Sequence, residues 1–272
     1  MAVACLRLLI SLVVFLPWLL RRPVKQELAR LAMALGAVQF GLMYIFYIAA
    51  YQYLPAYAVA LYTIFTPLYV AGLADALVQR WRRRHTLAAM LAVVGAAIVT
   101  VGSLGGGSAL RGIGLLQMSN LCFAAGQVGY RRLVAPGRDT AGTVRSDAAA
   151  QAGGESEVAI LGWMYLGATL VTAVVALVGS DRARLGFDRS ALLVLLYLGL
   201  VPTALGFYLW NKGAVRVRSG VLAAANNLKI PLAVLCTWLI FSESADHVRV
   251  IAGLAFIVAA LFVAGRDPES AH

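Results

Sequence analysis

The stretch "YIFYIAAYQYLPAYAVALYTIFTPLYVAGL", residues 44–73, joins one apolar run to a second run that is broken by a proline. It aligns, at an offset of 164 residues, with "YLWNKGAVRVRSGVLAAANNLKIPLAVLCT", residues 208–237, and the alignment pairs Pro67 with Pro231. In both copies a charged turn follows, and then a span rich in small residues. Because the identity between the copies is low, the shared order of these elements is what predicts an internal repeat.

Composition assigns the chain to the membrane class. Of its 272 residues, 61% are hydrophobic and 13% are charged, and the mean hydropathy is +0.82, whereas an average soluble domain carries about 25% charged residues. Several apolar runs approach the roughly 20 residues that cross the hydrocarbon core of a bilayer. We read nine spans, at about 2–20, 32–52, 57–78, 86–104, 113–130, 158–178, 190–210, 220–241 and 250–265. The sequence therefore predicts an all-α integral membrane protein with nine transmembrane helices.

The spans divide into two repeats of four and five spans. The expected domains are a first repeat at 1–104, a glycine-rich linker at 105–112, a second repeat at 113–265 and a cytoplasmic tail at 266–272. Because the two copies insert with opposite orientation, their plan is that of the inverted-repeat secondary transporters. The counterpart of the span at 113–130 would precede Met1. We therefore expect that the chain lacks the first helix of a ten-span protein, through a misplaced start or a genuine truncation.

The basic residues set the expected orientation. If the first span runs from outside to inside, sixteen Lys and Arg residues fall in inner segments and five in outer segments, as the positive-inside rule requires. Topology therefore explains the net charge of +11, and a nucleic-acid partner is not expected. Only Arg7 and Lys229 remain inside spans.

Four motifs give the chain a resemblance to a known family. They are "ACLRLLIS" (4–11), "YIAAYQYLPAYAVALYTIFTPLYVAGL" (47–73), "GLVPTALGFYLWNKGAV" (199–215) and "SGVLAAANNLKIPLAVLCTWLIFSE" (219–243). In their order and spacing they resemble the drug/metabolite transporter superfamily, of the bacterial permease type with two EamA domains. The resemblance covers nearly the whole chain. It implies a ten-helix carrier of the bacterial inner membrane that moves small metabolites through a central cavity between its repeats.

Lys229 is the leading candidate for a substrate-binding residue. It lies deep in the span at 220–241, where a lysine cannot easily reach the interface. Asn226 is one turn back on the same face, and Pro231 frees the carbonyl of Asn227. Since no Asp or Glu is central in a span, an anionic ligand is the natural counter-charge. We interpret Lys229 as an anion clamp; a lysine that only hydrogen-bonds carbonyls or amides is the alternative.

The span at 113–130 carries a polar stripe. It consists of Gln117, Asn120, Ala124 and Gln127, at positions i, i+3, i+7 and i+10. Lipid is a poor environment for such a stripe. We expect Gln117 and Asn120 either to line the cavity or to hydrogen-bond neighbouring helices.

Tyr44 and Tyr208 occupy repeat-related positions deep in their spans, and we expect them to contact substrate, although packing is the commoner role of aromatic rows. Pro67 and Pro231 are the expected helix breaks. Arg7 is near the outer end of its span, and we interpret it as an arginine that snorkels to the interface.

The sequence contains no recognisable catalytic motif: His85, His247 and His272 are scattered among loops and tail. We expect no enzyme activity, no cofactor and no metal. The expected partners are the lipid bilayer, a small-molecule substrate, a coupling proton or counter-substrate, and a second copy of the chain in a homodimer.

The favoured function is alternating-access transport of a small anionic or zwitterionic metabolite, of the organic-acid or amino-acid type. Two alternatives stay open. One is an organic-phosphate or nucleotide-sugar exchanger, and the other is a non-transporting membrane partner that has degenerated by losing its first helix.

Overall fold

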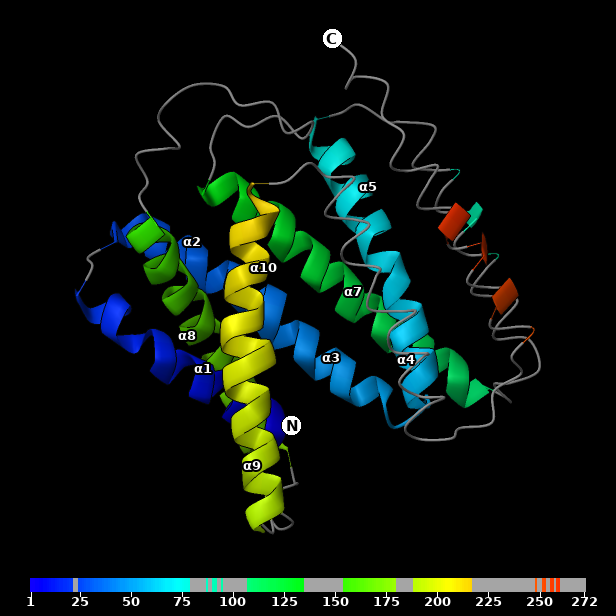
Figure 1. Cartoon of the computed structure of the whole chain (residues 1–272), viewed down its shortest axis with the longest axis horizontal. Helices are drawn as coiled ribbons and strands as arrows, with labels where there is room; N and C mark the ends of the chain where they lie inside the picture. The colour runs from blue at the N-terminus through cyan, green and yellow to red at the C-terminus, as the bar shows by residue number, and fades with distance from the viewer. Residues whose placement is uncertain are drawn as a thin grey trace. The chain divides into compact units, whose positions relative to one another are not determined.

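The protein is all-helical wherever its structure is described. The computed structural model describes residues 1–21, 24–78, 107–134, 154–179 and 188–216, and a few positions between 87 and 94 and between 248 and 259. The first helices are α1 (Ala2–Arg21), α2 (Gln26–Gly36), η1 (Ala37–Leu42), α3 (Met43–Ala50), α4 (Ala56–Tyr62), η2 (Thr63–Phe65) and α5 (Thr66–Val78). They are followed by α7 (Gly107–Val134), α8 (Gly154–Val178), α9 (Arg189–Leu198), η4 (Gly199–Gly206) and α10 (Phe207–Ala214). Figure 1 shows these helices.

Two of the long helices contain a wider turn within an otherwise continuous rod. Segments η1 and η4 are π-helical, and they join α2 to α3 and α9 to α10, so that residues 26–50 and 189–214 each run as one helix (Figure 1). Segment η2 is a 3-10 turn between α4 and α5. Wider or tighter turns of this kind recur at functional sites and at places where the sequence strains the helix.

Five of the described helices are long and apolar enough to cross a membrane. They are Ala2–Arg21, Gln26–Ala50, Ala58–Leu77, Glu157–Val178 and Arg189–Ala214. Each corresponds to a predicted span, with ends that differ by a few residues. The prediction of an all-α membrane fold is therefore confirmed, while the total of nine spans stays a prediction.

Helix α7 differs from its predicted span. It begins at Gly107 and so includes residues 107–112 of the segment that we expected to be a linker. A Cβ at Gly112 would lie 2.7 Å from side-chain atoms of both Tyr53 and Leu54. Glycine is therefore needed inside this helix for close packing, whereas in the sequence the same glycines look like loop residues. Helix α7 is also more polar than the five apolar helices and is not one of them.

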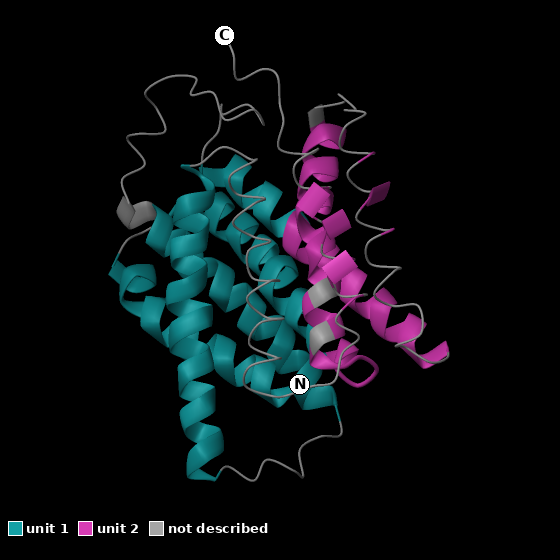
Figure 2. Ribbon diagram, turned by 45° about the vertical axis from the view of Figure 1, so that its right-hand side comes forward, with its two compact units in different colours: residues 1–48, 125–139, 143–216 teal, residues 49–124, 140–142, 217–272 magenta. Residues whose placement is uncertain are grey.

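The chain divides into two compact units (Figure 2). Unit 1 comprises residues 1–48, 125–139 and 143–216, and unit 2 comprises residues 49–124, 140–142 and 217–272. Unit 1 contains helices from both predicted repeats, because α1 and α2 belong to the first repeat and α8 to α10 belong to the second.

Within unit 1, α2 and α8 pack backbone against backbone. A Cβ at Gly36 would overlap the backbone of Met164, and a Cβ at Gly167 would overlap the backbone of Met33. Small residues at a helix crossing allow this close approach in membrane proteins, where packing rather than the hydrophobic effect drives helix association. The glycines thus hold α8 against the helix that carries Phe40 and Tyr44, two residues of the site described below.

Candidate functional site

A cation without an acidic partner lies inside unit 1. The Arg7 guanidinium, on α1, donates from Nε and Nη2 to the Thr203 hydroxyl at 3.0 and 2.7 Å, and it lies over the Tyr44 ring at 4.3 Å from the centroid. No carboxylate pairs with it among the described residues. The sequence suggested that Arg7 extends to the interface, but its guanidinium instead contacts two neutral side chains on other helices of the unit.

Thr203 lies next to Pro202 in the π-helical turn η4. Pro202 has no N–H, so the carbonyl of Leu198 loses its usual partner four residues on. The Thr203 hydroxyl donates to that carbonyl at 2.6 Å, and its oxygen accepts from Arg7. The Thr203 carbonyl in turn accepts from the hydroxyl of Tyr165 on α8. The π-helical segment η4 therefore connects α1 and α8 through a single threonine.

An aromatic cluster surrounds this polar contact. The Tyr165 ring stacks between Phe15 and Phe40, with centroids 5.2 Å away on each side and interplanar angles of 13° and 12°. Phe207 packs against Phe40 at 4.8 Å and against Tyr44 at 6.4 Å. Among these rings Phe15, Phe40, Tyr44 and Tyr165 are buried. A positive charge beside such a cluster interacts more strongly with an anion than it would in water, because the local dielectric is low.

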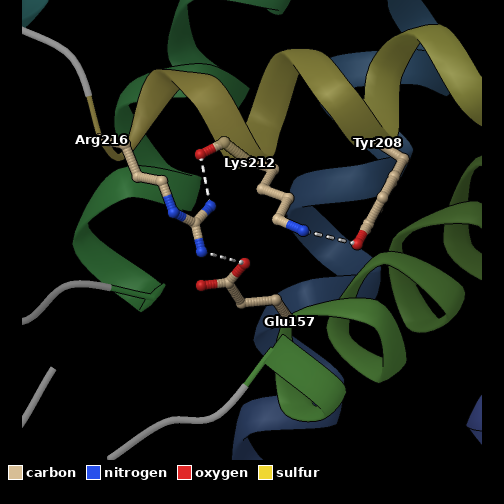
Figure 3. A network of polar contacts seen from close by, with 4 residues as sticks. All are labelled: Glu157, Tyr208, Lys212 and Arg216. Atoms are coloured by element: carbon tan, nitrogen blue, oxygen red, sulfur yellow. Dashed lines mark hydrogen bonds and ion pairs between the residues drawn. The ribbon is translucent and has the colours of Figure 1, made fainter. Parts of the chain in front are cut away.

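Tyr208 contributes to a polar network at the end of α10, which Figure 3 shows. Its hydroxyl accepts a hydrogen bond from Lys212 Nζ at 3.3 Å, and its ring lies 6.3 Å from that of Phe15. Arg216 donates to the Lys212 carbonyl at 2.7 Å and pairs with Glu157, on α8, at 3.8 Å. Tyr44 and Tyr208 therefore both border the aromatic cluster, Tyr44 beneath an arginine and Tyr208 beside a lysine.

In unit 2 the polar stripe of α7 meets the break at Pro67. Pro67 leaves the carbonyl of Thr63 without its helical partner, and the Thr66 hydroxyl and N–H both bond to that carbonyl. The Tyr62 carbonyl lies at the start of this 3-10 turn. Asn120 Nδ2 donates to it at 2.9 Å.

Gln117 extends this network by one turn of α7. Its Oε1 accepts from the Tyr69 hydroxyl at 3.0 Å and from Asn120 Nδ2 at 3.2 Å, while its Nε2 has no hydrogen-bond partner within the described part of the chain. Asn120 is buried and Gln117 is half-buried. Of the two roles left open by the sequence, these contacts favour hydrogen bonding between helices for Asn120. For Gln117 they leave one amide donor unused as far as the described residues go.

We expect Asn120→Leu to destabilise the protein by about 1–2 kcal/mol, because the buried hydrogen bonds of Asn120 with the Tyr62 carbonyl and the Thr66 hydroxyl are lost. Thermal unfolding in detergent measures the effect, and Met118→Leu, an exposed position on the same helix, is the matched control. If Asn120→Leu unfolded at the same temperature as the wild type but transported poorly, Asn120 would be a substrate contact and not a support for the break.

Three of the predicted site residues, Lys229, Asn226 and Pro231, lie outside the described residues, and their roles stay predictions. Two residues that the sequence analysis did not select, Thr203 and Tyr165, are part of the site. A signal for them was present: Arg7 lies in a span with no acidic residue to neutralise it, and Thr203 directly follows a proline inside an apolar run.

Comparison with known proteins identifies the family. The model of the EamA-like transporter family matches residues 1–101 and 148–265. The chain belongs to this family. Its EamA relatives include a "probable biotin transporter" of Pseudomonas aeruginosa, which is 37% identical over 263 residues that cover 94% of this chain and 85% of that protein.

Other relatives carry the same description. The biotin transporter of Salmonella typhimurium is 33% identical and the match covers 95% of this chain and 81% of the relative; for that of Escherichia coli K12 the values are 31%, 93% and 80%. One protein of known crystal structure aligns with a TM-score of 0.64 at 19% identity, over 96% of this chain and 85% of its own, which supports the fold alone. This EamA protein is thus a multi-pass membrane transporter of a small metabolite.

Proposed function

We propose that this chain carries biotin, or a closely related carboxylated metabolite, across the bacterial inner membrane by alternating access. The names of the relatives support this substrate, and the observation that carries the proposal is the Arg7 guanidinium, whose partners among the described residues are all neutral and lie beside a cluster of aromatic rings. Biotin is neither a simple organic acid nor an amino acid, so a carboxylated vitamin replaces, in this proposal, the substrate class expected from the sequence.

Biotin has a carboxylate and an apolar part, and unit 1 offers an arginine beside a group of aromatic rings. The molecule carries a carboxylate at the end of an aliphatic chain, and the chain leads to a fused ring system. An arginine binds a carboxylate through two parallel, charge-assisted hydrogen bonds, and stacked aromatic rings offer apolar contact area at low cost in conformational entropy. Arg7 therefore holds the carboxylate, and the rings of Tyr44, Phe40 and Phe207 face the apolar part of the substrate.

Lys229 has a second role in this proposal. It is the other cation that the sequence places inside a span, and inverted-repeat carriers bind substrates near the middle of the membrane. We assign to Lys229 the anion clamp of the second repeat, with Asn226 as its hydrogen-bond partner. Transport is then coupled to a proton or to a counter-substrate.

Growth of a bacterium that can neither synthesise nor import biotin tests the function. Expression of this chain is expected to restore growth at low external biotin, and an excess of an unrelated monocarboxylate such as acetate is expected not to compete. Failure to restore growth, with the protein present in the membrane fraction, would contradict the proposal.

A further inference from the structure

Gln39 is a buried amide whose hydrogen-bonding groups are unused. It lies in the π-helical segment η1, its side chain is fully buried, and neither Oε1 nor Nε2 has a hydrogen-bond partner among the described residues. Buried polar groups are nearly always paired, since leaving one unpaired forfeits its interaction with water. A buried glutamine with both ends unpaired within the described part of the chain is therefore a candidate for binding a ligand.

Other buried polar groups of unit 1 also have no hydrogen-bond partner among the described residues, and two of them are central here. They are the hydroxyl of Tyr130, on α7, and Oδ1 of Asn211, on α10, and both residues are fully buried. Tyr130 is one turn from Gly126, where a Cβ would overlap the Gln39 side chain. Asn211 is one turn from Phe207, whose ring contacts Phe40, the neighbour of Gln39. Both groups thus lie on elements that pack against the Gln39–Phe40 pair.

We propose that Gln39, Tyr130 and Asn211 bind the uncharged, hydrogen-bonding end of the substrate, which in biotin is a cyclic urea. This inference rests on the proposed function. A cyclic urea offers two N–H donors and one carbonyl acceptor. Gln39 Oε1 and Asn211 Oδ1 accept from the donors, while Gln39 Nε2 and the Tyr130 hydroxyl donate to the carbonyl.

In this proposal the charged, apolar and hydrogen-bonding groups of unit 1 come in the same order as those of the substrate. Arg7 holds the carboxylate over Tyr44, the rings of Phe40 and Phe207 cover the apolar chain, and the amide groups hold the urea. These groups form a chain of contacts: the Arg7 guanidinium lies over the Tyr44 ring, and Phe207 packs against both Tyr44 and Phe40. Sites built to hydrogen-bond a polar group strongly reject analogues that lack it, so the amides determine specificity.

The variant Gln39→Met separates this role from a structural one. Methionine keeps the length and flexibility of glutamine and removes two unpaired polar atoms, so the thermal stability is expected to stay the same or to rise. The KM for labelled biotin is expected to rise about tenfold or more, because two hydrogen bonds to substrate are lost. The matched control is Thr172→Val on α8, since the Thr172 hydroxyl bonds carbonyls of its own helix; transport should be unchanged.

Competition with a diamine analogue of biotin, which lacks the ureido carbonyl, supplies the second measurement. The wild type is expected to prefer biotin over the diamine, and Gln39→Met is expected to lose that preference. If the wild type transports biotin and Gln39→Met keeps both the KM and the preference, this inference is wrong and the proposed function stands. If the wild type itself does not transport biotin, both are wrong.

Discussion

Replacing Arg7 by methionine is expected to lower kcat/KM for biotin by about 100-fold or more while the protein still folds and inserts. The loss corresponds to one bidentate, charge-assisted contact between the guanidinium and the substrate carboxylate. Methionine retains the apolar stem that packs beside Tyr44. Folding should tolerate the change because the Thr203 hydroxyl still donates to the Leu198 carbonyl, so no buried donor is left unpaired.

Two further variants and the thermal stability of Arg7→Met distinguish a substrate-binding arginine from a structural one. Arg30→Met, at an exposed position of α2, controls for the loss of one positive charge and should transport normally. Arg7→Lys should retain part of the activity, since it keeps the charge but loses the two-pronged geometry. If Arg7→Met unfolded at a lower temperature and transported biotin with an unchanged KM, Arg7 would be a structural residue.

Replacing Lys229 by methionine is expected to abolish transport of an anionic substrate while folding and insertion stay intact. A lysine at bilayer depth lowers the stability of the inserted helix, and the sequence places no acidic residue centrally in any span to neutralise it. We expect the loss to exceed about 100-fold, as when one partner of a buried charge pair is removed.

Lys25→Met, at an exposed position before α2, is the matched control for Lys229→Met. Uptake rates and the amount of protein in the membrane are measured together. Unchanged uptake in Lys229→Met would remove the clamp role from this residue and leave Arg7 as the cation that recognises the carboxylate.

The membrane class and the helix positions could be predicted because both depend on the length of apolar runs, which can be counted from the sequence. The five apolar helices of the described part of the chain fall where those runs lie. The extension of α7 through Gly107 and Gly112 could not be predicted in this way. In the sequence Gly112 is typical of a loop, and only the structure shows that Tyr53 and Leu54 pack against it.

Part of the candidate site could be predicted because repeat-related positions can also be found in the sequence. Tyr44 and Tyr208 were selected by their repeat-related positions, and both border the aromatic cluster. Their partners could not be selected, because the direction of a long side chain such as Arg7 depends on what the neighbouring helices offer. Thr203 and Tyr165 acquire their roles only when the proline break in η4 brings them together.

Transport by the purified protein in liposomes decides whether this chain carries biotin. Purified protein in liposomes, given labelled biotin outside and unlabelled biotin inside, is predicted to accumulate label in a saturable manner, with little accumulation by Arg7→Met. Accumulation no greater than in protein-free liposomes, from a preparation that is folded and correctly inserted, would contradict the account.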